Sequence, residues 1–320
     1  MNAELLKKLG RITDEEQRLL RGEILNKRLY TASHDFIVDK VNLLETGKLI
    51  SVRPHTRFTD FPLHRHNYVE IIYMCSGQTE HMINGELPLI LGAGELLFLN
   101  QHVSHAIKRA ELYDIAINFI VMPQFFDFVL DIIGSDHILG QFLLNCLRQS
   151  SGYADFLHFK VAEVKRVQNQ MENLVIGMFE PDMSSRLINQ VSMSLLFLLL
   201  LGHIDRMNTA GPGRSSHALV LGALQSIQDH YQNVTLSAIA ERHGVSLAYV
   251  SRLVKEATGK SFKELLMEKR LGKAEQLLIN TALSTADIIT AVGYENTSYF
   301  YRIFRERYGL SPKQYRKLNK

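Results

Sequence analysis

The chain has 320 residues, of which 46% are hydrophobic and 22% are charged. This balance is typical of globular proteins and excludes wholesale disorder, and the length is enough for about two domains. The net charge of +3 is unevenly spread, because residues 217–320 carry 15 Lys and Arg against 9 Asp and Glu, while the residues before them carry 21 against 24. The basic C-terminal third therefore indicates a polyanionic partner.

Cysteine content and hydropathy indicate the cellular compartment of the protein. The two cysteines, Cys75 and Cys146, are too few for a disulfide framework and fit a reducing compartment. The N-terminus has no apolar core typical of a secretory signal, and the most apolar stretch, 191–201, is much shorter than the roughly 20 residues that cross a bilayer. We therefore expect a cytoplasmic protein that does not contact membranes.

The N-terminal 121 residues predict a helical extension followed by a β-structure. Leucine spacing in residues 3–30 predicts one or two amphipathic helices in an N-terminal extension of residues 1–47. Residues 48–121 then break into short β-prone runs, and Asn84-Gly85 between two of them predicts a type I′ hairpin. The runs span residues 69–75, 78–83, 87–92, 95–100, 105–109 and 113–121. Several short strands separated by turn residues predict a small antiparallel barrel or sandwich.

Helical periodicity takes over in residues 122–207. Apolar residues recur at three- and four-residue spacing in four segments, 123–134, 135–149, 161–179 and 182–204. The last two segments carry more Leu, Val and Met than one small domain needs, which favours a homodimer interface over plain intramolecular packing. Gly, Pro and Ser in residues 208–216 then predict a linker.

The remaining residues, 217–320, predict short helices with sharp ends. Thr235 and Ser246 stand where helix N-caps are expected, with Gly244 between the two helices. Two short helices joined by a tight turn with glycine are typical of a helix-turn-helix, here at about residues 235–257.

The same pattern recurs after a connecting helix at residues 262–280. Ser284 begins a short helix, Gly293 follows it, and a longer basic helix starts at residue 297. We therefore predict a second helix-turn-helix at about residues 284–308, with Phe300 and Phe304 in its core.

Two strings in this region, AIAERHGVSLAYVSRLVKEATGKSF (238–262) and GYENTSYFYRIFRERYGLSPKQYR (293–316), resemble the DNA-binding domain of AraC/XylS-type transcription regulators. The resemblance implies an all-α domain that places two recognition helices into successive major-groove segments of double-stranded promoter DNA, about 34 Å apart.

The resemblance also implies which side chains contact DNA. Base contacts are implied for Leu247, Ala248, Ser251, Arg252, Thr297, Ser298, Tyr301 and Arg302. The two arginines are the best candidates for base reading, because a guanidinium can donate two hydrogen bonds to guanine. Phosphate contacts, which position the protein without reading sequence, are implied for Lys255, Asn296, Lys313 and Arg316.

The spacing of His64, His66 and Glu70, with Gly94 and His105 later, resembles the two motifs of cupins. In metal-binding cupins these His and Glu positions hold a divalent ion, and the set would suit Mn, Fe, Ni or Zn. Sensor domains of AraC-type regulators commonly keep such a remnant without metal. We therefore expect no metal and no cofactor, and an effector at His64, His66, Glu70 and His105.

The predicted fold is mixed α and β, with an N-terminal cupin-like barrel plus helices and a C-terminal double helix-turn-helix. The expected function is effector-controlled transcription regulation, with activation as the family's more frequent mode. Family habit implies a sugar or carbon-source metabolite as effector, for which Arg53, Arg57 and Arg65 are candidate contacts with surface ion pairing as the alternative. RNA polymerase is a further expected partner.

Two other functions remain open at this stage. One is a metal-dependent cupin enzyme fused to a DNA-binding module, and the other is a regulator whose barrel binds a protein partner. We expect a non-enzyme, because the sequence has no nucleophile elbow, phosphate-binding glycine loop or cluster of cysteines.

Overall fold

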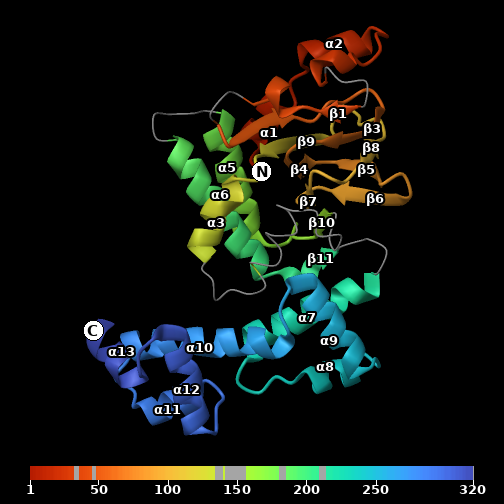
Figure 1. The fold of residues 1–320 in the computed structure, drawn as a ribbon. Helices are drawn as coiled ribbons and strands as arrows, with labels where there is room; N and C mark the ends of the chain where they lie inside the picture. The colour runs from red at the N-terminus through yellow and green to blue at the C-terminus, as the bar shows by residue number, and fades with distance from the viewer. Residues whose placement is uncertain are drawn as a thin grey trace. The chain divides into compact units, whose positions relative to one another are not determined.

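The computed structural model describes residues 1–31, 36–44, 48–133, 140, 156–179, 185–208 and 214–319. The chain forms two compact units, one of Met1–Ile132 and Leu143–Pro212, the other of Ile133–Phe142 and Gly213–Lys320 (Figure 1). Cys146, nearly all of the helix expected at 135–149 and the middle of the expected linker lie outside the described residues.

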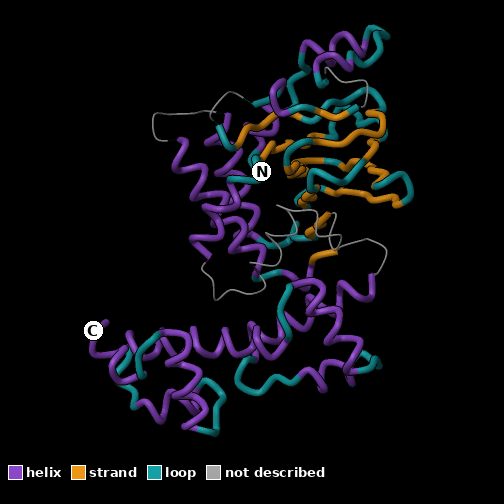
Figure 2. Tube along the Cα trace, viewed as in Figure 1, coloured by secondary structure: helices purple, strands orange, loops and turns teal. Residues whose placement is uncertain are grey.

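Two β-sheets form the body of the first unit. One has the strand order β1-β3-β8-β5-β6 and the other β11-β10-β7-β4-β9-β2. The strands are β1 (Ile37–Val38), β2 (Ile50–Pro54), β3 (Phe61–His66), β4 (Val69–Ser76), β5 (Gln78–Ile83), β6 (Leu87–Gly92), β7 (Leu96–Leu99), β8 (His105–Ile107), β9 (Ile115–Val121), β10 (Phe156–Phe159) and β11 (Met207–Asn208). Figure 2 shows these strands in orange.

The two sheets share one core. Ile72 and Leu97 of the six-stranded sheet pack in the same buried cluster as Ile83 and Leu91 of the five-stranded sheet. Neighbouring strands are antiparallel except for β1 and β3. The predicted mixed fold with a cupin-like N-terminal barrel is therefore confirmed.

The predicted strands and hairpin are confirmed closely. Asn84 and Gly85 have φ angles of 52° and 74°, the left-handed values of a type I′ turn, and Glu86 N donates to Ile83 O over 3.1 Å. The histidine motif is divided between two strands. The chain bends at residues 67–68, so His64 and His66 end β3 in one sheet and Glu70 lies on β4 in the other.

Helices accompany the sheets of the first unit. They are α1 (Ala3–Leu9), α2 (Asp14–Leu20), α3 (Phe125–Ile133), α5 (Lys165–Phe179) and α6 (Ser185–Leu201), with short 3-10 helices at Lys27–Leu29, Lys40–Asn42 and Ile204–Arg206. The region predicted as helical thus also supplies strands β10 and β11. No helix of the described residues is long and apolar enough to cross a membrane.

The second unit is built of helices. They are α7 (Arg214–His230), α8 (Leu236–Arg242), α9 (Leu247–Thr258), α10 (Phe262–Asn280), α11 (Thr285–Ala291), α12 (Thr297–Tyr308) and α13 (Pro312–Asn319). Thr235, Ser246 and Ser284 cap α8, α9 and α11 as predicted. Phe300 and Phe304 are fully buried, also as predicted. The last three residues of the expected linker, 214–216, already belong to α7.

The second unit contains a structural repeat at a spacing of about 50 residues. Helices α9 and α12 are both 12 residues long, and each ends at a left-handed glycine, Gly259 or Gly309. The preceding turns also match, because Val245 N donates to Ala240 O and Tyr294 N donates to Ile289 O, each over 3.0 Å. Helix α10 packs against α7 and α9 of the first half and against α11 and α13 of the second.

Candidate functional site

The second unit exposes the residues expected to contact bases. Leu247 is 50% exposed at the start of α9 and Tyr301 is 37% exposed on α12. Ala248, Arg252, Thr297, Ser298 and Arg302 are also exposed, and Ser251 is half-buried. The buried faces of the same helices hold Val250, Leu253 and Val254 in α9 and Phe300, Ile303 and Phe304 in α12. Each helix is thus anchored on one face and free on the other.

The two arginines have equivalent surroundings. Arg252 lies over the ring of Tyr249 at 5.6 Å, and Arg302 lies over the ring of Tyr299 at 5.4 Å. Arg252 also lies 3.8 Å from Glu256, but both side chains are exposed and such a pair contributes little. An arginine steadied by an aromatic face keeps its donors available for a planar acceptor such as guanine.

The four residues expected to contact phosphates differ in their surroundings. Lys255 and Lys313 are exposed. Asn296 is exposed and caps α12, with its Oδ1 accepting from Tyr299 N over 2.9 Å. Arg316 donates from Nε to Leu278 O over 3.0 Å and from Nη2 to Leu283 O over 2.7 Å, which anchors α13 to the end of α10. Arg316 therefore also stabilises the fold.

In the first unit, the barrel brings together the four residues expected to bind an effector. His64 on β3 is the register partner of His105 on β8. Side-chain alternation buries both His64 and His66, and Glu70 reaches the same place from the facing sheet. Glu70 Oε2 lies 3.4 Å from Nε2 of His66 and 3.4 Å from Nε2 of His105. The bend in the chain thus completes the cluster that the spacing predicted.

Burial controls the protonation of this cluster. It lowers the pKa of His64 to about 4 and holds the pKa of His66 and of His105 well below the ordinary value. Burial raises the pKa of Glu70 to about 7, although a hydrogen bond from Asn118 acts in the opposite direction. Near neutral pH the imidazoles are therefore uncharged and keep a lone pair each.

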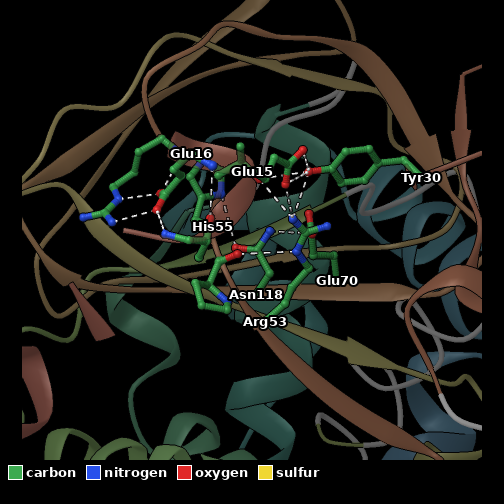
Figure 3. A network of polar contacts seen from close by, with 11 residues as sticks. Glu15, Glu16, Tyr30, Arg53, His55, Glu70 and Asn118 are labelled. Carbon is green, nitrogen blue, oxygen red and sulfur yellow. Dashed lines mark hydrogen bonds and ion pairs between the residues drawn. The ribbon is translucent and has the colours of Figure 1, made fainter. Parts of the chain in front are cut away.

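Tyr30 of the N-terminal extension and Arg53 of β2 line the same cavity as His64, His66 and Glu70. Arg53 Nη2 donates to Tyr30 Oη and to Thr56 Oγ1, both over 3.0 Å, and Tyr30 Oη donates to Glu15 over 2.8 Å. Figure 3 shows this group together with His55, Asn118 and Glu70. Hydrogen bonds therefore link Glu15 and Tyr30 of the extension to Arg53, which lines the central cavity.

The other two arginines considered as effector contacts lie elsewhere. Arg57 is buried and binds Glu16 through two bonds, Nε to Oε1 over 2.7 Å and Nη2 to Oε2 over 2.9 Å. Arg65 is exposed on β3. Only Arg53 therefore lies at the cavity that contains the histidines.

Two cavities border these strands. A cavity of about 20 Å³ is lined by Tyr30, Arg53, His64, His66, Glu70 and Asn118, among others. This is room for about one water-sized atom. A second cavity, of about 380 Å³, is lined by residues of β3, β5, β6 and β8, among them the exposed Ile90, and by the exposed Lys108 just after β8.

Three residues around the cluster had no sequence signal. His55, just after β2, places Nδ1 3.3 Å from Asn118 Oδ1, and Asn118 Nδ2 donates to Glu70 Oε1 over 2.9 Å. His81 on β5 lies 3.4 Å from His105 between their Nδ1 atoms. These contacts join strands that are far apart in the sequence. The only sequence signal for the three residues is the alternation of side chains along each strand, which turns every second one into the barrel.

Comparison with known proteins matches both units. Residues 49–201 match a family model described as "AraC-like ligand binding domain", and residues 239–318 match one described as "Helix-turn-helix domain". The first of these matches spans the barrel and also helices α3, α5 and α6.

Similar whole proteins are regulators. The HTH-type transcriptional activator RhaS of Escherichia coli O1:K1 / APEC is 25% identical over 88% of this chain and 96% of its own length. RhaS of Salmonella paratyphi A is 26% identical over the same shares.

Solved structures are also similar. The C-terminal domain of AraT, a response regulator from Geobacillus stearothermophilus, is 40% identical over 31% of this chain and 84% of its own, with a TM-score of 0.30. ToxT from Vibrio cholerae O395 is 13% identical over 85% and 97%, with a TM-score of 0.34. From the family models and the RhaS relatives, the chain belongs to the AraC family of transcription regulators.

Proposed function

We propose that the chain is a sequence-specific DNA-binding transcription activator whose barrel binds a small-molecule effector. The observation that carries the DNA-binding role is the repeat of α9 and α12, each anchored on one face and presenting an arginine beside a tyrosine on the other. Activation is carried over from the RhaS relatives. Effector binding shifts the regulator's DNA-binding equilibrium only by the effector's difference in affinity for the two states.

The first prediction concerns base reading by α12. Arg302→Ala is expected to weaken binding to a duplex selected by the wild-type protein from random sequences by about 10- to 100-fold, because one bidentate base contact is worth about 1–3 kcal/mol. The loss should be accompanied by relaxed preference at one base position. Fluorescence anisotropy against the selected duplex and its single-base variants measures both.

Lys313→Ala is the matched comparison, because its expected partner is a phosphate. It should weaken binding to selected and random duplexes alike and reduce the slope of log affinity against log salt by about 1. Failure of the wild-type protein to prefer any duplex over random DNA would contradict the DNA-binding proposal. Unchanged affinity and salt slope in both variants would contradict the assigned docking alone.

We also propose that the chain forms a homodimer and that helix α6 supplies the interface. It leaves five apolar side chains substantially exposed, namely Leu187, Ile188, Val191, Leu195 and Leu198. At 100° per residue these positions fall within one stripe about 100° wide, opposite the residues that α6 buries. A continuous apolar stripe of this kind is typical of a protein interface.

The dimer proposal predicts a change of mass in solution. Val191→Glu with Leu195→Glu should convert a dimer into a monomer at micromolar concentration, because a two-fold interface loses each side chain twice and each apolar burial contributes about 1.5–3 kcal/mol. Sedimentation equilibrium on the full chain measures this. Ile24→Glu, at a position 90% exposed outside α6, is the control and should leave the mass unchanged. A monomeric wild-type protein would contradict the dimer.

For the effector, we propose a sugar or related metabolite bound at His64, His66, Glu70 and His105, beside the cavity that His55 and Asn118 also line. The support is the convergence of polar groups there, which is typical of small-molecule sites. Because the cavity has room for about one water-sized atom, side chains that line it must move for a sugar to enter. A saturable rise of the unfolding temperature of the full chain, tested with sugars and sugar acids, would identify the ligand class.

A variant pair locates the effector. Asn118→Ala should abolish the ligand-induced shift, whereas Ile90→Ser in the larger cavity should leave it intact. The reverse result would move the effector to the larger cavity. A partner protein that binds the barrel, without any small-molecule shift, would favour the alternative of a protein-interaction module.

A further inference from the structure

The larger cavity lies on the face of the five-stranded sheet that is turned away from the shared core. Buried and less buried side chains alternate along β5, and Glu80 and Met82 belong to the less buried set. Met82 pairs with Pro88 of β6 and with Ala106 of β8, so this face extends over all three strands. His105, next to Ala106 on β8, is buried on the opposite face. The larger cavity is therefore separate from the histidine cluster.

Apolar side chains form most of the wall of the larger cavity. Ile90 is 57% exposed and Pro88 is also exposed, while Pro62, Met82 and Ala106 are half-buried. A hollowed apolar surface that is open to solvent is typical of a binding site. The volume of about 380 Å³ lies within the range of about 300–1,000 Å³ that small-molecule sites occupy. The cavity thus has the size and the wall of a site for an apolar molecule.

Three charged side chains also line the larger cavity, namely Asp60, Glu80 and Lys108. Lys108 forms an ion pair with Glu80. Asp60 accepts a hydrogen bond from Arg109 N over 2.8 Å, but its carboxylate forms no ion pair within the described part of the chain. The side chain of Arg109 pairs instead with Glu111. The cavity therefore carries one uncompensated negative charge.

We propose that the larger cavity binds an organic cation with an apolar body, such as an aryl-alkylamine. The apolar body replaces water over Ile90 and Met82, which is favourable because apolar surface is buried. The ammonium group pairs with Asp60, whose charge has no partner cation. A carboxylate at the same place meets an excess of negative charge. The proposal goes beyond the sugar effector, which is placed at the histidines, and does not depend on DNA binding.

Three probes with the same apolar body and different charges test the proposal. Tryptamine, tryptophol and indoleacetic acid share an indole ring and end in an ammonium, a hydroxyl and a carboxylate at neutral pH. Isothermal titration calorimetry on the full chain is expected to show saturable binding of tryptamine, about 10-fold tighter than that of indoleacetic acid, with tryptophol between them. Raising the salt concentration to about 1 M should reduce this difference, because salt screens exposed charges.

Substitutions in the cavity separate the contribution of charge from that of apolar contact. Asp60→Asn should lower the affinity for tryptamine about 3- to 5-fold and leave that for tryptophol unchanged, because the amide oxygen still accepts from Arg109 N but carries no charge. Lys108→Met should have the opposite effect and tighten tryptamine binding, since it removes a like charge. Ile90→Ser should weaken binding of all three probes, because it removes apolar surface that they share.

The control is Glu111→Gln. Glu111 is also an exposed carboxylate in an ion pair, but it does not line the cavity, so its variant should bind the probes as the wild type does. Circular dichroism verifies that each variant folds. Absence of saturable tryptamine binding, or equal affinity for tryptamine and indoleacetic acid, overturns the proposal, and so does undiminished tryptamine affinity in Asp60→Asn. A sugar-induced shift that Ile90→Ser abolishes and Asn118→Ala retains also overturns it, because the larger cavity then holds the sugar effector.

Discussion

Replacing Arg57 with Met is expected to lower the free energy of unfolding of the first unit by about 3–5 kcal/mol, because it leaves a buried carboxylate without its cation. The Arg57 and Glu16 side chains are only 4% and 2% exposed. Arg57 also donates to the carbonyls of Leu112, Gly10 and Arg11 over 2.8, 3.2 and 3.2 Å. This single residue therefore ties the N-terminal extension to the barrel.

Calorimetry of the full chain measures the effect, which should lower the unfolding temperature by roughly 10 °C for a unit of this size. Arg109→Met is the matched control, since Arg109 pairs with Glu111 over 3.0 Å but both side chains are more than half exposed. Loss of such a pair should change stability by less than about 1 kcal/mol. Adding Glu16→Gln to Arg57→Met should restore part of the loss. Equal effects of Arg57→Met and Arg109→Met would contradict the importance of the buried pair.

The effect of Arg57→Met should also depend on pH. In the wild type, burial acts to raise the pKa of Glu16, but hydrogen bonds from Arg57 and Thr13 outweigh it and the pKa lies below the ordinary 4.5. This contribution to stability is fully present above the pKa of Glu16 in the unfolded chain, about 4.5, and is lost as pH falls through the lower pKa of the folded protein. Without Arg57, burial should raise the pKa of Glu16, so the folded variant gains relative stability as the carboxyl protonates. The stability difference should therefore narrow between pH 7 and pH 4.5.

Gly293→Ala is expected to destabilise the second unit by about 2–5 kcal/mol and to weaken DNA binding. Gly293 has a φ of 89°, which costs an alanine about 1–2 kcal/mol. A Cβ at this position would also lie 2.4 Å from the Gln232 carbonyl oxygen, and such overpacking costs about 1–3 kcal/mol more. Because Gly293 joins α11 to α12, any shift of the backbone moves the second recognition helix.

Gly244→Ala separates the two causes of destabilisation, the positive φ and the close approach to Gln232. Gly244 holds the equivalent turn with a φ of 63°, but nothing lies within 4 Å of the position where its Cβ would be. Its variant should therefore lose only the conformational part, about 1–2 kcal/mol. Calorimetry together with binding to a selected duplex compares the two variants. A loss at Gly244 equal to that at Gly293 would show that the close approach to Gln232 is unimportant.

Local sequence signals predicted most of the elements. The strands from β4 to β9 follow alternation and turn residues, and the N-caps Thr235, Ser246 and Ser284 mark where helices begin. These signals work because a cap or a tight turn satisfies backbone groups within a few residues. The two helix-turn-helix units were predictable for the same reason, and their repetition made the family resemblance specific.

Contacts between distant segments were decided only by the tertiary structure. The spacing of His64, His66 and Glu70 predicted a cluster. The bend at residues 67–68 and the pairing of β3 with β8 decide how these side chains and that of His105 meet. Short strands β10 and β11 gave no signal because they exist only through pairing with β7 and with each other. The hydrogen bonds of Arg316 to the carbonyls of Leu278 and Leu283 likewise had no sequence signal.

The sequence by itself thus determined most of the helices and strands, and the family. The tertiary structure decided which polar side chains are paired inside the fold and which remain available. The physical reason is that capping and alternation act over a few residues, whereas burial, ion pairing and the pKa of His64 or Glu70 depend on atoms brought together from across the chain.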